Sequence, residues 1–405
     1  MPAVCFYFQV HQPFRIKKYS IFDIGKDHDY FQHGADATHN VKILDKVSKK
    51  CYLPTNALLL KQLQANPDFK ISFSLSGVFL EQIAAHQPEV LNSFQALVKT
   101  GQVEILSETY FHSLSFLYSK HEFEAQVKAH GDLVKELFGV TPTVFRNTEL
   151  IYNNDLATQV ESMGFKGIIT EGADHILGDR SPNFLYQPKN TQNIKLLLKN
   201  YRLSDDIGFR FSDQNWSGFP LTADKFASWV DQFNGNGEII NLFMDYETFG
   251  EHQWDHTGIF QFLEHLPAAI LSHSGNSFMT PSEVVASFGT VSELDIPDFI
   301  SWADAERDLS AWRSNAMQTD AMDKLYALET QVKATNDQVL IGDWRKLQTS
   351  DHFYYMCTKF FQDGDIHTYF SPYQSPYEAF IYFMNVLKDF VIRLDNFKLS
   401  EQGIS

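Results

Sequence analysis

Short apolar runs rich in β-branched and aromatic residues recur along the first two thirds of the chain, with helical stretches between them. Helical periodicity is clear in residues 122–137 and 155–163. Strands that alternate with helices favour βαβ units and a parallel sheet. About seven strands over this length favour a closed or nearly closed barrel, although the pattern alone also fits a doubly wound sheet. The predicted strands are residues 4–10, 70–75, 103–106, 143–146, 167–170, 194–198 and 239–244.

The pattern changes after Ser292, where the strand signals stop and the chain from Asp304 onward has helical periodicity. We therefore predict a barrel over residues 1–300 and a C-terminal helical region over residues 301–405 that packs against it. The clearest helix follows Pro376, where apolar residues recur at steps of three and four. Its predicted apolar face is Tyr377, Phe380, Ile381, Met384, Leu387, Val391 and Leu394.

Two segments rich in Asn, Gly and Ser, residues 172–193 and 204–218, are predicted to be long loops. Loops of this length on a barrel tend to carry function rather than to act as linkers.

The charge narrows the choice of partners. The 405 residues carry a formal net charge of −17 with a pI near 5.3, and an acidic surface repels phosphate backbones and anionic lipid. Nucleic acid and membrane are therefore disfavoured, and a neutral substrate fits better. Part of the 15% aromatic content is available to stack on a flat ligand such as a sugar. The first residues lack the basic start of a signal peptide, so we expect a cytoplasmic protein.

The three cysteines, Cys5, Cys51 and Cys357, are far apart and show no CxxC spacing. They suggest neither a disulfide framework nor a thiolate metal site.

Acidic residues end three of the predicted strands, which is where a parallel barrel places its catalytic groups. The third strand carries Glu104 and is followed by Glu108, Glu149 follows the fourth, and Asp245 and Glu247 follow the last. A carboxyl group beside a buried strand is desolvated, which raises its pKa and makes it useful as an acid. Retaining glycoside hydrolysis needs two carboxyl groups about 5–5.5 Å apart, one as nucleophile and one as acid. A single acid at a strand end would more often be a helix cap, but three strands together favour catalysis.

Histidines raise the alternative of a metal centre. His11 ends the first strand, where it can donate a hydrogen bond to a sugar hydroxyl, and His112, His252 and His352 are weaker candidates. A hard or borderline cation could be held by His11, Asp245, Glu247, His252 and His256. Neither an HxxEH nor an HExxH spacing is present, so we expect no metal and no other cofactor.

Five short segments carry a family resemblance. They are HQP at 11–13, GQVEIL at 101–106, FRNTELIY at 145–152, FMDYETFGEHQW at 243–254 and SWADAERDLSAW at 301–312. In these segments the chain resembles glycoside hydrolase family 57, in the branch called α-amylases. The resemblance implies an α/β fold, an incomplete (β/α)7 TIM-like barrel followed by a C-terminal helical bundle. It also implies a retaining double displacement without a metal, with Glu149 as nucleophile and Asp245 as general acid/base.

The same resemblance implies sugar contacts. They map to His11, Glu104 and Glu247, and in the fifth segment to Asp308 and Trp312. Some branches place a stacking Trp where this chain has His252, and Trp254 lies two residues further on. The substrate-binding candidates are thus His11, Glu104, Glu247, His252, Trp254, Asp308 and Trp312.

The implied activity is hydrolysis of α-1,4-glucosidic bonds in α-glucans. A 4-α-glucanotransferase or other transglycosylase would use the same two acids, and a non-catalytic glycan-binding protein or a metal-dependent hydrolase are further alternatives. Trp302 and Trp312 could instead be structural anchors between the helices and the barrel.

Overall fold

The computed structural model describes residues 2–31, 40–359 and 371–401, and its strands form two sheets. All seven predicted strands are present, with bounds within one or two residues of those expected. The first sheet has the order β3-β2-β1-β8, with the short strand β9 also paired to β1, and the second has the order β10-β6-β7-β5-β4. The strands are β1 (Ala3–Val10), β2 (Ile71–Leu75), β3 (Val103–Ile105), β4 (Val144–Arg146), β5 (Gly167–Glu171), β6 (Leu185–Pro188), β7 (Lys195–Lys199), β8 (Ile239–Asp245), β9 (Ser277–Phe278) and β10 (Thr290–Leu294).

The two sheets join edge to edge into an incomplete seven-stranded barrel. Ser107, just after β3, donates its N–H to Val144 O at 3.0 Å and accepts Arg146 N–H at 2.8 Å, which connects β3 to β4. On the other side, Asn200 N–H donates to Asn241 O at 2.9 Å and Asn241 Nδ2 donates to Leu198 O at 2.8 Å, which connects β7 to β8. The ring therefore runs β1-β2-β3-β4-β5-β7-β8, and its ladders are parallel.

Strand β1 lies at the centre of the first sheet, and every one of its residues is buried. Its side chains alternate between two cores, as the period of two in a strand requires. Phe6 and Phe8 pack outward against the surrounding helices. Cys5 and Tyr7 point into the barrel, where they join a smaller cluster that includes Phe243. A strand buried on both faces has the continuous apolar sequence seen here.

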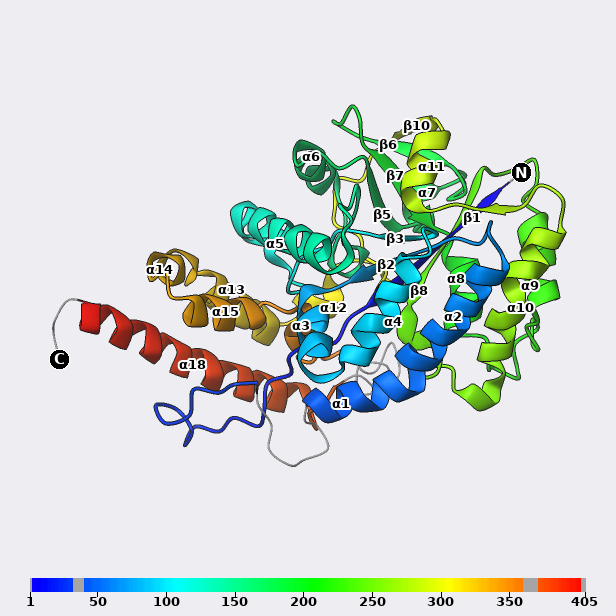
Figure 1. Ribbon diagram of the computed structural model, residues 1–405. Helices are drawn as coiled ribbons and strands as arrows, with labels where there is room; N and C mark the ends of the chain where they lie inside the picture. The colour runs from blue at the N-terminus through cyan, green and yellow to red at the C-terminus, as the bar shows by residue number, and fades with distance from the viewer. Residues whose placement is uncertain (1, 32–39, 360–370, 402–405) are drawn as a thin grey trace.

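Helices cover the outside of the ring, as Figure 1 shows. The predicted helix over 122–137 is α5, which begins after Ser119, whose hydroxyl accepts the N–H of Glu122, and ends at Gly139 in the left-handed conformation. The helix predicted over 155–163 is α6. The helices of this part are α1 (Asn40–Val47), α2 (Leu53–Ala65), α3 (Gly77–His86), α4 (Pro88–Val98), α5 (Lys120–Phe138), α6 (Asn154–Ser162), α7 (Asp174–Leu177), α8 (Tyr201–Gly208), α9 (Ala223–Asp231), α10 (Ile259–Ser272) and α11 (Pro281–Ser287).

The two segments predicted as long loops contain regular structure. Residues 172–193 include α7 and β6, and the segment 204–218 begins inside α8, which ends at Gly208. Strand β10 also extends past Ser292, where we expected strands to stop. Both β6 and β10 extend the second sheet outside the ring. Four of the five residues of β10 are exposed, so the strand lacks the apolar run that marks the barrel strands.

After the last strand the chain forms helices, which project to one side of the barrel in Figure 1. They share a core cluster with segments that follow the barrel strands, including Ile16, Tyr30 and Ile151. The position of the predicted boundary at residue 300 stays a prediction. The helices are α12 (Ser310–Arg313), α13 (Ala316–Tyr326), α14 (Glu329–Ala334), α15 (Gln338–Lys346), α16 (Ser350–Tyr354) and α18 (Pro376–Glu401).

The buried face of α18 agrees with the predicted one only at Leu387 and Leu394. Tyr377 and Ile381 are 63% and 53% exposed, and the buried stripe is Ala379, Phe383, Val386, Leu387, Phe390 and Leu394. Apolar residues lie on several sides of this helix, so more than one stripe fits the spacing. The residues that pack against α18 therefore determine which stripe is buried.

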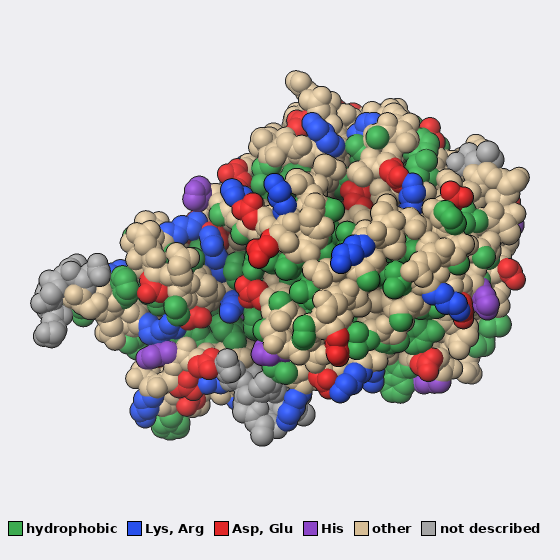
Figure 2. Space-filling model, viewed as in Figure 1, with side chains coloured by type: hydrophobic (Ala, Val, Ile, Leu, Met, Phe, Trp, Pro, Cys, Tyr) green, Lys and Arg blue, Asp and Glu red, His purple; other side chains and the backbone are tan. Residues whose placement is uncertain are grey.

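Charged side chains of both signs are interspersed over the face of the molecule shown in Figure 2. Within the three described ranges, every helix is too short or too polar to span a bilayer.

Candidate active site

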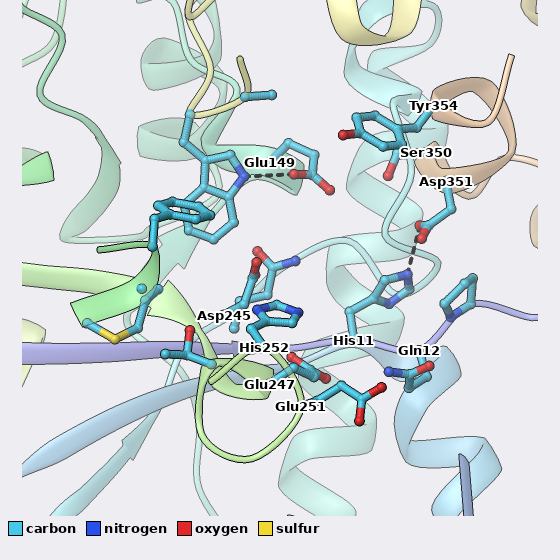
Figure 3. Close-up of a pocket in the computed structure, with 18 of the residues that line it drawn as sticks. His11, Gln12, Glu149, Asp245, Glu247, Glu251, His252, Ser350, Asp351 and Tyr354 are labelled. Atoms are coloured by element: carbon cyan, nitrogen blue, oxygen red, sulfur yellow. Dashed lines mark hydrogen bonds and ion pairs between the residues drawn. The ribbon is translucent and has the colours of Figure 1, made fainter. Parts of the chain in front are cut away.

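A pocket of about 640 Å³ lies where the carboxyl ends of β1, β4 and β8 meet, and segments from the C-terminal helical part form its other wall. Active sites of (β/α) barrels lie at this end of the strands. Figure 3 shows Glu149 and Asp245 facing the same space. The predicted site residues that line the pocket are His11, Glu149, Asp245, Glu247, His252 and Trp312.

Glu149 has an unusual backbone conformation. Its φ and ψ are 56° and 27°, and the next residue, Leu150, also has a positive φ of 51°. Two consecutive left-handed residues that are not glycine cost free energy, and such strain persists only where the surroundings hold it. Here Trp302 N–H donates to Glu149 O at 3.2 Å, and the Thr170 hydroxyl donates to Leu150 O at 2.8 Å.

Both oxygens of the Glu149 carboxylate are held. His112 Nε2 lies 3.1 Å from Oε1, and the indole N–H of Trp302 donates to Oε2 at 2.7 Å. Burial raises the pKa of Glu149, but the hydrogen bonds from His112 and Trp302 and the nearby positive charges outweigh it, so the pKa is lowered. Glu149 is therefore ionised in the resting site.

Asp245 has the opposite environment. It is the last residue of β8, opposite Gln9 of β1 in the ladder. Burial, and then the negative charge of Glu149, raise the pKa of Asp245 to about 6. The site thus holds an ionised carboxylate, Glu149, and a carboxyl group, Asp245, that is protonated at mildly acidic pH. Such a pair can supply one basic and one acidic group.

His112 carries the positive charge that stabilises Glu149. Its Nδ1 lies 3.0 Å from Glu108 Oε2 and its Nε2 faces Glu149, so both ring nitrogens carry protons. Burial lowers the pKa of His112, but its hydrogen bonds to Glu108 and Glu149 raise it to about 9. Burial raises the pKa of Glu108, but His112 and the guanidinium of Arg146 lower it to about 2. The result is a buried charged network directly behind the Glu149 carboxylate.

His11 is held as a neutral ring above His112. The two rings stack with centroids 4.0 Å apart. His11 Nδ1 lies 2.7 Å from the Ser76 hydroxyl, and Nε2 lies 3.0 Å from Asp351 Oδ2 (Figure 3). Burial, and then the charge of His112, lower the pKa of His11. The neutral ring therefore donates from Nε2 to Asp351 and accepts the Ser76 proton at Nδ1.

Ion pairs and a cation–π contact hold the segment that carries Trp302 and Arg307 against the barrel. Arg307 makes an ion pair with Glu171 at the end of β5, with Nη1 2.5 Å from Oε2. Lys199, at the end of β7, lies 3.6 Å from the same oxygen and 5.3 Å from the centroid of the Trp302 ring. These contacts hold the loop that carries Trp302 against the barrel, where its indole reaches Glu149.

Three predicted sugar contacts lie outside the pocket lining. Glu104 is in the middle of β3, not at its end, and its Oε2 accepts Ser282 N–H at 2.9 Å at the start of α11. Asp308 is exposed and bonds Ser310, and Trp254 is 53% exposed with Lys50 Nζ over its ring.

The other two candidates of uncertain role do line the pocket. Burial lowers the pKa of His252 to about 4, so the ring is neutral. Trp312 is 1% exposed and packs in the C-terminal core cluster while also bounding the pocket, so it is both an anchor and a wall.

Several residues of the site have no definite role in the prediction from sequence. There Glu108 is only an acid after the third predicted strand and His112 only a weaker candidate, and Arg146 lies within FRNTELIY. Trp302 lies in the fifth segment and is considered there only as a structural anchor. Asp351 carries no signal in the sequence, since its partner His11 is 340 residues away.

Within the described part of the chain, no group of three or more His, Cys, Asp or Glu side chains is arranged to hold a metal ion.

Comparisons with known proteins bear on the family of this chain. The sequence pattern of the family described as Glycosyl hydrolase family 57 matches residues 5–297. A protein of Methanocaldococcus jannaschii named "Putative alpha-amylase" is 44% identical over 399 residues, covering 96% of this chain and 84% of that protein. A 4-alpha-glucanotransferase of Thermococcus kodakarensis is 23% identical over 217 residues, covering 52% of this chain and 32% of that protein.

Among solved structures, the crystal structure of a GH57-type branching enzyme from Pyrococcus horikoshii has a TM-score of 0.74 at 16% identity. The likeness covers 100% of this chain and 92% of that one, and it shows a shared fold.

Proposed function

Because this chain belongs to glycosyl hydrolase family 57, we propose that it is a retaining glycoside hydrolase that cleaves α-1,4-glucosidic bonds in α-glucans. Glu149 is the nucleophile and Asp245 is the general acid/base. The observation that carries the proposal is the opposite pKa shift of these two neighbours: the pKa of Glu149 is lowered, and that of Asp245 is raised to about 6.

In the first step, Glu149 attacks the anomeric carbon while Asp245 gives its proton to the leaving glycosidic oxygen. The charge of Glu149 is neutralised as the glycosyl ester forms. Since that charge contributes to the raised pKa of Asp245, the pKa of Asp245 falls at the moment when it must act as a base. In the second step Asp245 takes a proton from water, the water attacks the anomeric carbon, and Glu149 leaves with the sugar configuration retained.

The surroundings support this division of roles. His112 and Trp302 occupy both oxygens of Glu149, so the carboxylate cannot rotate freely away from the substrate. The same two donors stabilise the carboxylate as it leaves in the second step.

Substrate binding is proposed for the polar residues that line the pocket. Glu247 can hydrogen-bond sugar hydroxyls, and neutral His252 can do so without adding charge to a neutral ligand. Both ring nitrogens of His11 are engaged by Ser76 and Asp351, so His11 offers the ligand the edge of its ring rather than a hydrogen bond. The indoles of Trp302 and Trp312 offer flat apolar walls for a sugar ring.

The test is product sizing. The protein is incubated with amylose, glycogen and maltoheptaose, and Glu149→Gln is compared with Glu264→Gln, a matched change in an exposed ion pair on α10. Hydrolysis yields shorter chains and new reducing ends from the wild type and Glu264→Gln, whereas Glu149→Gln yields none. Chains longer than maltoheptaose would assign transfer to another glucan as the main reaction. An active Glu149→Gln variant would refute the nucleophile assignment.

A further inference from the structure

A π-helical turn next to the pocket is not explained by the roles above. Residues Ser48–Tyr52 (η1) form it between α1 and α2, within what is otherwise continuous helix. A π-turn inserts one residue into a helix and re-aims the side chains around it, and such turns are often found at functional sites. Here the re-aimed side chain is Tyr52, which is fully buried.

The turn contacts the segment that follows Asp245. Cys51 Sγ donates to Tyr246 O at 3.2 Å, and the Tyr52 hydroxyl donates to Glu247 Oε1. Gly250, with φ of +107°, lies so close to the turn that a Cβ there would sit 2.0 Å from Lys50 O. The turn therefore packs closely against the segment 246–250, with contacts at Tyr246, Glu247 and Gly250.

The direction of the hydrogen bonds at Tyr52 is fixed by chemistry. The Arg15 guanidinium only donates, so Gln12 Oε1 accepts from it at 3.1 Å. The amide nitrogen of Gln12 then donates to the Tyr52 hydroxyl at 3.2 Å. Because the hydroxyl already accepts from Gln12, its single proton is committed to Glu247. The hydrogen bonds are therefore all donated in one direction, from Arg15 through Gln12 and Tyr52 to Glu247.

We propose that Tyr52 is a positioning residue for Glu247: its hydroxyl fixes Glu247 Oε1 and thereby presents Oε2 to the substrate. This inference rests on the proposed function for the identity of the ligand, a sugar hydroxyl. A carboxylate oxygen and the carbonyl oxygen of a carboxylic acid both accept, so Tyr52 holds Glu247 in either protonation state. Burial, and then the charge of Asp245, raise the pKa of Glu247 to about 8, so the carboxyl group can carry a proton near neutral pH, and that proton lies on Oε2 because Oε1 accepts from Tyr52.

Tyr52→Phe tests the proposal because it removes one hydroxyl and keeps the ring, which packs against Phe79 and Tyr246. The matched control is Tyr246→Phe. Tyr246 is equally buried and lies 6.3 Å from Tyr52 between ring centroids, but its hydroxyl donates to Asn56 at 2.5 Å, away from the pocket residues.

We expect Tyr52→Phe to lower kcat/KM about 10- to 100-fold, the range for a lost hydrogen bond to an ionisable group. Tyr246→Phe stays close to wild type. In a Glu247→Ala background, Tyr52→Phe causes no further loss, because its effect passes through Glu247. Equal losses in the two Phe variants, or a full additional loss in the Glu247→Ala background, would overturn the proposal.

A second readout does not depend on turnover. The infrared carbonyl band of protonated Glu247 is isolated by subtracting the spectrum of Glu247→Ala at mildly acidic pH. Tyr52→Phe should move this band to higher wavenumber, because the carbonyl loses a donor, and Tyr246→Phe should leave it in place. An unmoved band with an active wild type refutes the inference and leaves the function intact. A moved band in a protein inactive on every α-glucan refutes the function and keeps the inference.

Discussion

Replacing Trp302 with Phe isolates one hydrogen bond to Glu149, the proposed nucleophile. The change deletes the indole N–H that donates to Glu149 Oε2 at 2.7 Å and keeps an aromatic ring between Arg146 and Lys199. A hydrogen bond to a charged group contributes about 1.5–3 kcal/mol. Because the bond is already made in the free enzyme, only the part of this free energy that is larger in the transition state affects kcat/KM, so its loss lowers kcat/KM by at most about 10- to 100-fold. The Glu149 side chain is 20% exposed, so water can replace part of the bond and the lower end is expected.

The sign of the pH effect is also determined. The proposed mechanism requires ionised Glu149, and the Trp302 hydrogen bond lowers the pKa of Glu149. Removing it raises that pKa, so the acidic limb of kcat/KM moves to higher pH. The alkaline limb follows the proton on Asp245, whose pKa is about 6, so the active range narrows from the acidic side. Both limbs report the coupled pair rather than either residue alone.

The assay is kcat/KM for maltoheptaose across the acidic and neutral range, with thermal unfolding measured in parallel. Trp229→Phe is the control, because that indole also has a lysine amine over its ring, Lys225, and lies outside the pocket lining. An acidic limb that stays in place or moves to lower pH in Trp302→Phe would refute the reasoning. So would a loss of activity no greater than that of Trp229→Phe.

Other perturbations have equally definite outcomes. Asp245→Asn should slow the hydrolysis of starch about 10²- to 10⁴-fold, and the loss should be smaller for aryl glycosides, whose good leaving groups need less protonation. The measurement is the ratio of wild-type to variant kcat/KM for each substrate, and equal ratios would exclude Asp245 as the acid. Trp312→Ala empties a site that is 1% exposed, so the free energy of unfolding should fall by about 3–5 kcal/mol, seen as a lower Tm; an unchanged Tm with a raised KM would make Trp312 a sugar-binding residue only. EDTA should leave activity unchanged, because the two carboxyl groups suffice for double displacement; inactivation that added zinc reverses would favour a metal-dependent hydrolase.

The residues at strand ends could be predicted from the sequence. The apolar runs identify buried parallel strands, and the carboxyl ends of parallel strands converge, so Glu149, Asp245 and His11 had to lie near one another. The same logic explains why Glu104 is not at the pocket. Its strand continues to Ile105 and Leu106, and its carboxylate caps α11 instead.

Contacts between distant elements could not be predicted in this way. Tyr52 meets Glu247 across 195 positions, and Trp302 meets Glu149 across 153. Each lies in a segment whose local pattern describes only a helix or a loop. Strand β10 was missed for a different reason, since periodicity detects burial and four of the five residues of β10 are exposed.

The contact between His11 and Asp351 has a consequence for protein synthesis. A nascent chain that has emerged through β8 already holds both carboxyl groups, but it lacks Trp302 and Asp351. Domains generally form as the ribosome releases them, at about 5–20 residues per second. The barrel is therefore exposed to the cell before the last helices arrive, with Glu149 unsupported at one oxygen and His11 at one nitrogen. The arrangement of Glu149 and His11 is therefore complete only when the C-terminal helices have packed against the barrel.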